Sequence, residues 1–242
     1  MSVFARPGAY DYNATVFSPD GRLYQVEYAR ELVNRGATIV GIKCVEGVVL
    51  GSEENVEVLE EEGCSWKIFR IDEHFGATIV GLSSDARVLI DQARIDAQSN
   101  KLTYDEPIDV EVASRKICDL QQTYTQHGGG RPFGVAMILG GVDKTGPHVF
   151  GTHPSGNYTG FKATAVGEGT ETVLSMLKEE YHEDLTLENC IKLAVKCLVK
   201  ALQTRELPLR IKIAIIPTAT KTMSMLTDEK VEGYIKDLSS KN

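Results

Sequence analysis

Apolar positions follow two different periods along this chain, and the changes between them predict the order of its elements. The N-terminal segment SPDGRLYQVEYARELVNRG has apolar residues at helical spacing, and Gly36 stands where a glycine often follows the last helical turn. Runs rich in β-branched residues come next and predict strands at 37–42, 48–52, 66–71 and 76–82. The chain therefore opens with one helix and two pairs of strands.

The rest of the chain repeats this scheme, with paired helices between groups of strands. The helices are predicted at 83–100, which opens on two serines as expected caps, and at 109–126, 170–181, 185–203 and 228–238. The further strands are predicted at 134–140, 147–151, 161–167 and 211–217. Strands adjacent in sequence favour antiparallel hairpins, and paired helices can cover the faces of sheets. We predict an α/β (α+β) fold, a four-layer α-β-β-α sandwich.

The hexapeptide GATIVG occurs twice, at 36–41 and at 76–81. A structural repeat would extend past six residues, but the flanks NR and IK of the first copy do not match HF and LS of the second. Each copy is a short apolar run that begins and ends on glycine. We therefore interpret the copies as two strands, buried on both faces, that converged on one kind of environment.

Composition and charge argue against several classes of function. The chain has 242 residues and a formal net charge of -8, which repels phosphate backbones, so nucleic acid is not an expected partner. No apolar run approaches the roughly 20 residues that span a bilayer. The N-terminal MSVFARPGAY lacks the apolar core of a signal peptide. We expect no membrane partner and a cytoplasmic protein, which would also be nuclear in a eukaryote.

Cysteines and histidines do not follow the patterns of disulfide or metal sites. The five cysteines are an odd set without a CxxC spacing, which disfavours a disulfide framework and a zinc ribbon. Cys190 and Cys197 are seven residues apart in a helical pattern, so we predict that both lie in the core. His148 and His153 have no third ligand nearby, and HGGG is not followed by GK[ST]. We expect neither metal nor cofactor.

Several long motifs resemble one family. YDYNATVFSPDGRLYQVEYA, at 10–29, is similar to the N-terminal signature of proteasome α-type subunits. The resemblance continues in KLTYDEPIDVE, YTQHGGGRPFGVAMILGGVD and HPSGNYTGFKATAVGEG, and it covers nearly the whole chain. It implies the four-layer fold of N-terminal-nucleophile hydrolases. Residues 36–242 would form this sandwich, and residues 1–35 would be an N-terminal gate segment and helix of the same domain.

The start of the first strand separates catalytic from non-catalytic members of this fold. In the family's catalytic β-type subunits, a threonine freed by cleavage after a glycine is the nucleophile, and its own amine is the base. Aligned on Gly36, that position holds Ala37, and Thr38 comes one residue too late. Glu53 and Lys67 fall near the acidic and lysine positions, but they make no protease without a nucleophile and a free amine. We predict a non-catalytic subunit of a threonine endopeptidase complex.

Two alternatives stay open. A catalytic threonine peptidase of the same fold would use Thr38 after unusual processing, and an intact N-terminus upstream of Tyr10 would exclude it. A stand-alone scaffold ring would lack protease partners, and co-purification of β subunits would separate it from our prediction. The sequence leaves open whether a ring would contain one kind of α subunit or several.

The resemblance assigns five residues to an activator pocket. Lys67 matches a lysine that lies between neighbouring α subunits and pairs with the C-terminal carboxylate of activator tails ending in hydrophobic–tyrosine–any residue. Gly81 and Leu82 match residues lining the same groove, and Glu27 and Arg30 lie on the N-terminal helix that borders it. A lone lysine is more often simply solvated, but the contexts WKIFRI and GLSSDARVLI favour the pocket.

A second group of residues matches the family's gate. Tyr10, Asp11, Pro19 and Tyr28 correspond to a cluster that holds the N-terminal tails upright when an activator shifts the turn at Pro19. The simpler interpretation is turn chemistry, because SPDG is a good type I turn sequence in any protein. Tyr12 stands where the family usually has arginine, so the residue for the usual closed-gate salt bridge is missing.

A third group, His127, Gly128, Gly129 and Gly130, matches the loop that lines the entry annulus, although it also has the composition of a helix C-cap loop. The function implied by the resemblance follows from these groups. Seven α subunits would form an outer ring stacked on β subunits, admit unfolded protein substrates through a gated pore, and dock an ATPase activator for ATP-dependent protein degradation of the ubiquitin type or the archaeal type.

Overall fold

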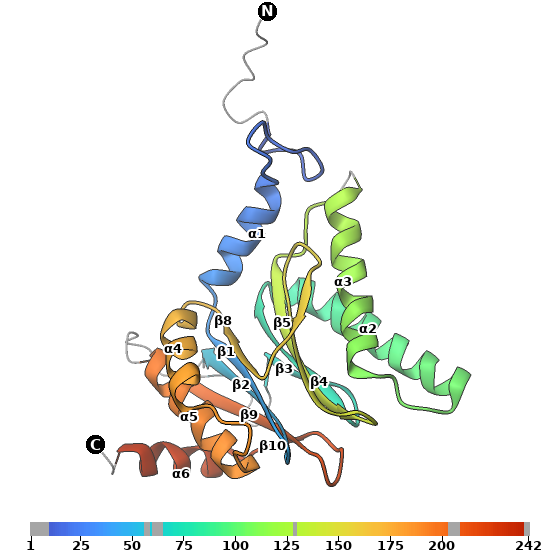
Figure 1. Ribbon diagram of the computed structural model, residues 1–242. Coiled ribbons are helices and arrows are strands. Elements are labelled where there is room, and N and C mark those ends of the chain that lie inside the picture. The colour runs from blue at the N-terminus through green and yellow to red at the C-terminus, as the bar shows by residue number, and fades with distance from the viewer. Residues whose placement is uncertain (1–9, 56–58, 60–64, 128–129, 203–208, 240–242) are drawn as a thin grey trace, which may run out of the picture.

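The computed structural model describes residues 10–55, 59, 65–127, 130–202 and 209–239 (Figure 1). Two five-stranded antiparallel sheets pack face to face within them. The strand order of the first sheet is β10 (Ser224–Met225), β9 (Leu209–Pro217), β2 (Gly47–Asn55), β1 (Ile39–Cys44) and β8 (Ala163–Val166). The order of the second is β3 (Ile68–Asp72), β4 (Phe75–Gly81), β5 (Val135–Asp143), β6 (Gly146–Thr152) and β7 (Tyr158–Gly160).

Helices cover the outer face of each sheet (Figure 1). The second sheet is covered by α2 (Ser83–Tyr104) and α3 (Val110–Gln126). The first sheet is covered by α4 (Thr170–Glu180), α5 (Leu187–Leu202) and α6 (Asp228–Ser239). The remaining helix, α1 (Tyr24–Asn34), contacts β4 and β5 at one end of the sandwich and buries Val26, Ala29 and Val33. The predicted four-layer α-β-β-α sandwich is confirmed.

Three apolar layers hold the sandwich together. One lies between the sheets and includes the fully buried Ile39, Leu50 and Ile138. The other two lie between each sheet and its helices. Burying one such side chain contributes about 1.5–3 kcal/mol. At Gly41 the sheets approach so closely that a Cβ would lie 2.5 Å from Ile138 Cγ2, which explains a glycine inside β1.

Three details differ from the sequence prediction. The first strand begins at Ile39 rather than at 37. The short strands β7 and β10 were not predicted, because none of their residues is buried and they show no apolar pattern. Gly36 does follow α1, but its φ is not positive, and the helix is capped by Arg35. Close packing explains the glycine at position 36, since a Cβ there would lie 2.4 Å from Val80 Cγ2.

The two GATIVG copies lie in different sheets, one at the start of β1 and one in β4. Both are largely buried, as predicted, but their threonines have different partners. The Thr38 hydroxyl accepts a hydrogen bond from Gly169 N at 3.0 Å. The Thr78 hydroxyl is buried and has no hydrogen-bond partner among the described residues. The same hexapeptide therefore serves two different local structures.

This difference predicts opposite effects for one substitution. Thr78→Val is expected to raise the free energy of unfolding by about 1 kcal/mol, because it removes an unpaired buried hydroxyl at nearly constant volume. Thr38→Val is expected to lower it by about 1–3 kcal/mol, because Gly169 N loses its acceptor. Urea denaturation of the purified variants measures both values. Equal effects at the two positions would contradict the hydrogen-bond assignment.

The cysteines of the described residues are buried in the core. Cys190 and Cys197 are both fully buried in α5, which confirms their predicted place in the core. Cys44, Cys118, Cys190 and Cys197 are free thiols. Within the described ranges, no three histidine, cysteine or acidic side chains are grouped in a way that would hold a metal ion. No helix in the same ranges has both the length and the apolar character needed to cross a membrane.

Candidate functional site

The position of the family's nucleophile is occupied by a buried alanine. Ala37 is 8% exposed and follows α1 without a break through Gly36, so its nitrogen is a peptide amide. Gly36 O accepts a hydrogen bond from Glu168 N at 2.9 Å. Gly167, with φ +120°, passes so close that a Cβ there would lie 2.9 Å from Ala37 O. The main chain at this point is enclosed by its neighbours and carries no reactive group.

Thr38, the candidate nucleophile of the alternative hypothesis, is engaged through all its polar groups. Its side chain is buried, and its hydroxyl is the acceptor for Gly169 N. Its N–H donates to Glu53 Oε2 at 3.2 Å, and its carbonyl accepts from Glu53 N at 3.0 Å. The hydroxyl therefore orders the turn before α4 and is not presented to solvent.

Lys67 lies directly before β3 and next to the same group. Its Nζ donates to Glu53 O at 3.0 Å, and its carbonyl accepts from Ile79 N of β4 at 2.9 Å. The side chain is half-buried, whereas Glu53 is 1% exposed. The structure thus brings Thr38, Glu53 and Lys67 together beside Ala37.

Gly81 and Leu82 form the junction between β4 and α2. Gly81 has φ +113°, and a Cβ would lie 2.2 Å from Gly134 O, so only glycine fits. Leu82 N donates to the same oxygen at 2.9 Å. The side chains of Leu82 and of Leu32 in α1 both pack over Gly134 and are partly exposed, at 36% and 41%. The junction offers an apolar surface beside α1.

Glu27 and Arg30 lie on α1 and have neighbours within the same chain. Arg22 Nε donates to Glu27 Oε1 at 2.8 Å, and this hydrogen bond lowers the pKa of Glu27 despite partial desolvation. Desolvation, and then the positive charge of Arg30, lowers the pKa of His153. Arg30 is therefore close enough to the turn at His153 to act on it electrostatically.

Two of the predicted gate residues, Asp11 and Tyr28, lie close together near the start of α1. Gln25 Nε2 donates to Asp11 O. Desolvation, together with the charge and a hydrogen bond of Asp11, raises the pKa of the Tyr28 phenol. The rings of Tyr24 and Tyr28 stack with centroids 6.3 Å apart. Tyr10 is half-buried within the turn that precedes them.

The predicted turn at Pro19 is present. Gly21 N donates to Ser18 O at 2.8 Å, Arg22 N donates to Ser18 Oγ at 3.1 Å, and Gly21 has φ +75°. Pro19 is exposed at the tip of this turn. Tyr12, the departure from the family pattern, is 93% exposed.

The predicted pore loop begins at the end of α3. His127 is the C-cap residue, and its N–H donates to Thr123 O at 3.1 Å. Its Nδ1 lies 3.0 Å from the same oxygen. Gly130 is exposed, and a Cβ there would lie 3.2 Å from the Tyr124 ring. Gly128 and Gly129 lie outside the described residues.

One ion pair next to these groups was missed by the sequence analysis. Asp85, in the first turn of α2, accepts two hydrogen bonds from the Arg131 guanidinium. Asp85 and Arg131 are 46 residues apart, and no local pattern reveals a pair at that separation.

The N-terminus of α2 differs from the sequence prediction. No side-chain hydrogen bond caps this helix, so the expected serine cap is wrong.

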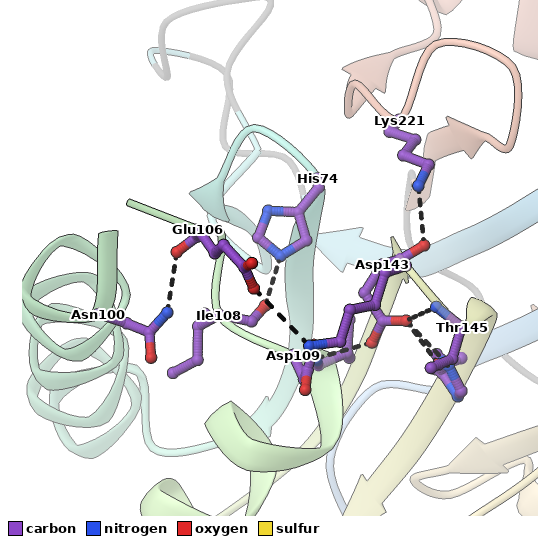
Figure 2. A network of polar contacts seen from close by, with 11 residues as sticks. His74, Asn100, Glu106, Ile108, Asp109, Asp143, Thr145 and Lys221 are labelled. Atoms are coloured by element: carbon purple, nitrogen blue, oxygen red, sulfur yellow. Dashed lines mark hydrogen bonds and ion pairs between the residues drawn. The ribbon is translucent and has the colours of Figure 1, made fainter. Parts of the chain in front are cut away.

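A second polar network holds the connection between α2 and α3, and the motif KLTYDEPIDVE spans this connection and the adjoining ends of both helices (Figure 2). Asn100 Nδ2 donates to Glu106 O at 2.9 Å. The buried His74, from the turn between β3 and β4, places Nε2 2.8 Å from Ile108 O. The motif is therefore held by the side chains of Asn100, from α2, and His74, from the turn between β3 and β4.

Asp143 anchors the other side of this network (Figure 2). Its carboxylate accepts from Thr145 N at 2.8 Å and from Val110 N at 3.1 Å, and its carbonyl accepts from Lys221 Nζ at 3.0 Å. Burial by itself would raise the pKa of Asp143, but the hydrogen bonds from Thr145 and Val110, together with His148, lower it. A cavity of about 400 Å³ beside these groups is lined by side chains of both charges.

Comparison with known proteins gives one consistent result. The family profile for the N-terminal signature of A-type proteasome subunits matches residues 10–31, and the profile "Proteasome subunit" matches residues 33–216. "Proteasome subunit alpha" of Methanopyrus kandleri is 51% identical over 218 residues, which cover 89% of this chain and 88% of that protein.

Two further relatives match over a still larger part of the chain. "Proteasome subunit alpha" of Thermococcus sibiricus is 48% identical over 237 residues, covering 97% of this chain and 90% of that protein. The protein of the same name from Methanosarcina acetivorans is 46% identical over 235 residues, covering 96% and 95%. The chain therefore belongs to the proteasome subunit family and is an α-type member of it.

Proposed function

We propose that this α-type proteasome subunit is non-catalytic and that it controls access to active sites carried by partner subunits. As a member of the proteasome it takes part in proteolysis and assembles with other proteasome subunits. In our proposal, seven copies or close relatives form an outer ring on β subunits, gate the entry of unfolded proteins, and dock an ATPase activator.

The observation that carries the proposal is the alanine at the nucleophile position. N-terminal-nucleophile catalysis needs a hydroxyl or thiol and a free amine on one residue. Ala37 has neither, because it has a methyl side chain and an amide nitrogen within a continuous chain. Thr38 does not replace it, since its hydroxyl is buried and bonded to Gly169 N. In our proposal Glu53 and Lys67 therefore have no catalytic role at this position.

The docking part of the proposal rests on Lys67, Gly81 and Leu82. Lys67 places an ammonium group at the edge of the sandwich, where a flexible stem can deliver it to a terminal carboxylate. Leu82 and its neighbour Leu32 offer apolar area for a hydrophobic or tyrosine side chain of the tail. Glu27 and Arg30 lie on α1, so in our proposal a neighbouring subunit supplies them to the pocket.

The gating part rests on the N-terminal cluster. Asp11, in the segment that leads into α1, lies close enough to Tyr28 within that helix to raise the pKa of its phenol. We infer that Tyr10, Asp11, Pro19 and Tyr28 hold the N-terminal tail, and that His127 and the glycines at 128–130 line the pore. Tyr12 projects into solvent in place of the family's arginine, so closure depends on other contacts.

The test is covalent labelling followed by intact-mass measurement. The purified chain, alone and after assembly with a catalytic β subunit, is treated with an electrophilic peptide inhibitor. We expect the adduct on the β subunit only, and an α chain whose mass includes residues upstream of Tyr10. The β subunit in the same sample is the positive control. An adduct on this chain when it is alone, or a mature terminus at Thr38, would contradict the proposal.

A further inference from the structure

Asp85 connects two parts of the chain that the proposed function treats as separate sites. Its side chain is 12% exposed. It accepts hydrogen bonds from Arg131 Nη1 at 2.5 Å, from Arg131 Nη2 at 2.8 Å and from Gly134 N at 2.8 Å. Bidentate arginine–carboxylate pairs are among the strongest and most directional hydrogen-bonded contacts in proteins. The segment 131–134 is therefore tied to the first turn of α2.

The main chain adds further ties at the same place. Leu82 N donates to Gly134 O, and Gly81 pairs with Val135 across the two strands. The N–H of Gly134 thus donates a hydrogen bond to Asp85, and its carbonyl accepts one from Leu82 N. Leu82 and Asp85 are three residues apart in the sequence. Leu82 and Asp85 thus both hold Gly134, at the end of segment 131–134.

The other end of this segment reaches the proposed pore loop. Phe133 packs edge-on against Tyr124 of α3, with ring centroids 4.8 Å apart. Gly130, the residue before Arg131, lies next to the same tyrosine ring, since a Cβ there would be 3.2 Å from it. Residues 130–134 therefore bridge the beginning of α2 and the end of α3, and Asp85 is the charged group that holds them there.

The charge state of Asp85 supports a lasting contact. The hydrogen bonds from Arg131, opposed by desolvation and assisted by the Gly134 amide, lower the pKa of Asp85. The carboxylate is thus ionised at neutral pH. Although Arg131 is 54% exposed, its guanidinium is fixed further by a hydrogen bond from Nη1 to Pro132 O at 2.9 Å.

We propose that Asp85 is a positioning residue that couples the docking residues Gly81 and Leu82 to Gly130 and the segment 131–134 beside the pore. The coupling rests on the proposed function, because it takes Gly81 and Leu82 as the contact for an activator tail. When a bound tail shifts Leu82, the first turn of α2 moves with Leu82. The hydrogen bonds of Asp85 then move Arg131 and Gly134 in the same direction. Without the carboxylate, the main-chain hydrogen bonds and the packing of Leu82 over Gly134 remain, but the side-chain hydrogen bonds to Arg131 and Gly134 are lost.

Hydrogen exchange of the assembled particle tests the coupling. The probe is a synthetic peptide ending in Leu-Tyr-Ala, and its binding is measured separately by fluorescence anisotropy. In the unmodified assembly, we expect the peptide to change exchange in fragments that cover 130–140. In Asp85→Asn, we expect binding within about two-fold of the unmodified value, exchange in 130–140 at least about five-fold faster without peptide, and no further change on adding it.

Two more variants separate this role from general loss of stability. Asp91→Asn removes another carboxylate of α2, one that pairs with Arg94 at 3.2 Å, and is expected to behave like the unmodified assembly. Arg131→Gln breaks the same ion pair by changing its exposed partner. This variant replaces Asp85→Asn in the exchange experiment if Asp85→Asn does not assemble. A merely structural role would speed exchange along all of α2 and β5 and keep the response to the peptide.

The outcomes distinguish the coupling from the docking function. If the peptide binds and changes exchange at 130–140 equally with and without Asp85, the coupling is wrong and docking stands. If the peptide fails to bind the unmodified assembly, docking is wrong, and the coupling falls with it even where Asp85→Asn loosens the segment. A response that is lost in both Asp85→Asn and Arg131→Gln but kept in Asp91→Asn supports the coupling.

Discussion

Replacing Lys67 with methionine is expected to abolish the stimulation of peptide hydrolysis that an activator tail peptide produces in the assembled core particle. The tail's terminal carboxylate needs a cation, and of the two cations in the proposed pocket, Lys67 and Arg30, our proposal assigns this role to Lys67. Methionine keeps most of the apolar stem and removes only the charge. Stimulation is measured as the ratio of hydrolysis rates with and without a saturating tail peptide, and we expect this ratio to fall to about one.

Two matched variants control the Lys67 experiment. Lys116→Met removes a lysine from α3 that pairs with Asp96 at 3.3 Å, so it changes the net charge equally and is expected to keep full stimulation. Lys67→Arg retains the charge on a planar, longer group and is expected to restore only part of the response. Because Lys67 Nζ also binds Glu53 O, thermal unfolding of each variant checks that the fold is retained. Undiminished stimulation in Lys67→Met would remove this residue from the pocket.

Replacing Gly81 with alanine is expected to lower the free energy of unfolding by about 3–5 kcal/mol, or to prevent folding. Two costs add at this position. The φ of +113° is one that residues with a Cβ rarely adopt. The new methyl would also lie 2.2 Å from Gly134 O, a main-chain atom that moves only if β4 and β5 separate. Urea denaturation of the purified chain measures the loss.

Gly146 provides the matched control for Gly81. It has a nearly equal φ of +119°, but a Cβ there would meet no atom within 4 Å. Gly146→Ala therefore isolates the conformational cost and is expected to lower stability by about 1 kcal/mol. The difference between the two variants measures the steric contact with Gly134. Equal losses would show that the junction between β4 and α2 is not packed as closely as described.

Much of the candidate site was visible in the sequence because its decisive features are local. The alanine at position 37 is the identity of one residue at a recognisable place, and the SPDG turn depends on four consecutive residues. Lys67, Gly81 and Leu82 were chosen from motif context, and the structure places them at the adjoining ends of β3, β4 and α2. Their role in docking remains a prediction, because a pocket between subunits requires more than one chain.

Other parts of the site had no local signal. The pairing of Asp85 with Arg131 depends on how the turn before β5 meets the start of α2. Gly36 was predicted as a helix cap from its position after an apolar stripe, but the structure shows that it avoids Val80 across the sandwich. The strands β7 and β10 are too short and too exposed to leave an apolar pattern.

The sequence by itself determined the order of the helices and of every strand except β7 and β10, the sandwich they build, and the alanine at the position where the family's nucleophile is expected. Each of these follows from residue identity or from a period of two or 3.6 residues, which short-range geometry imposes on any chain. Only the tertiary structure decided which of two identical threonines has a hydrogen-bond partner, which glycine is required for space, and which carboxylate holds the segment beside the proposed pore. Those properties depend on atoms that are distant in the sequence and meet only when the sheets and helices pack.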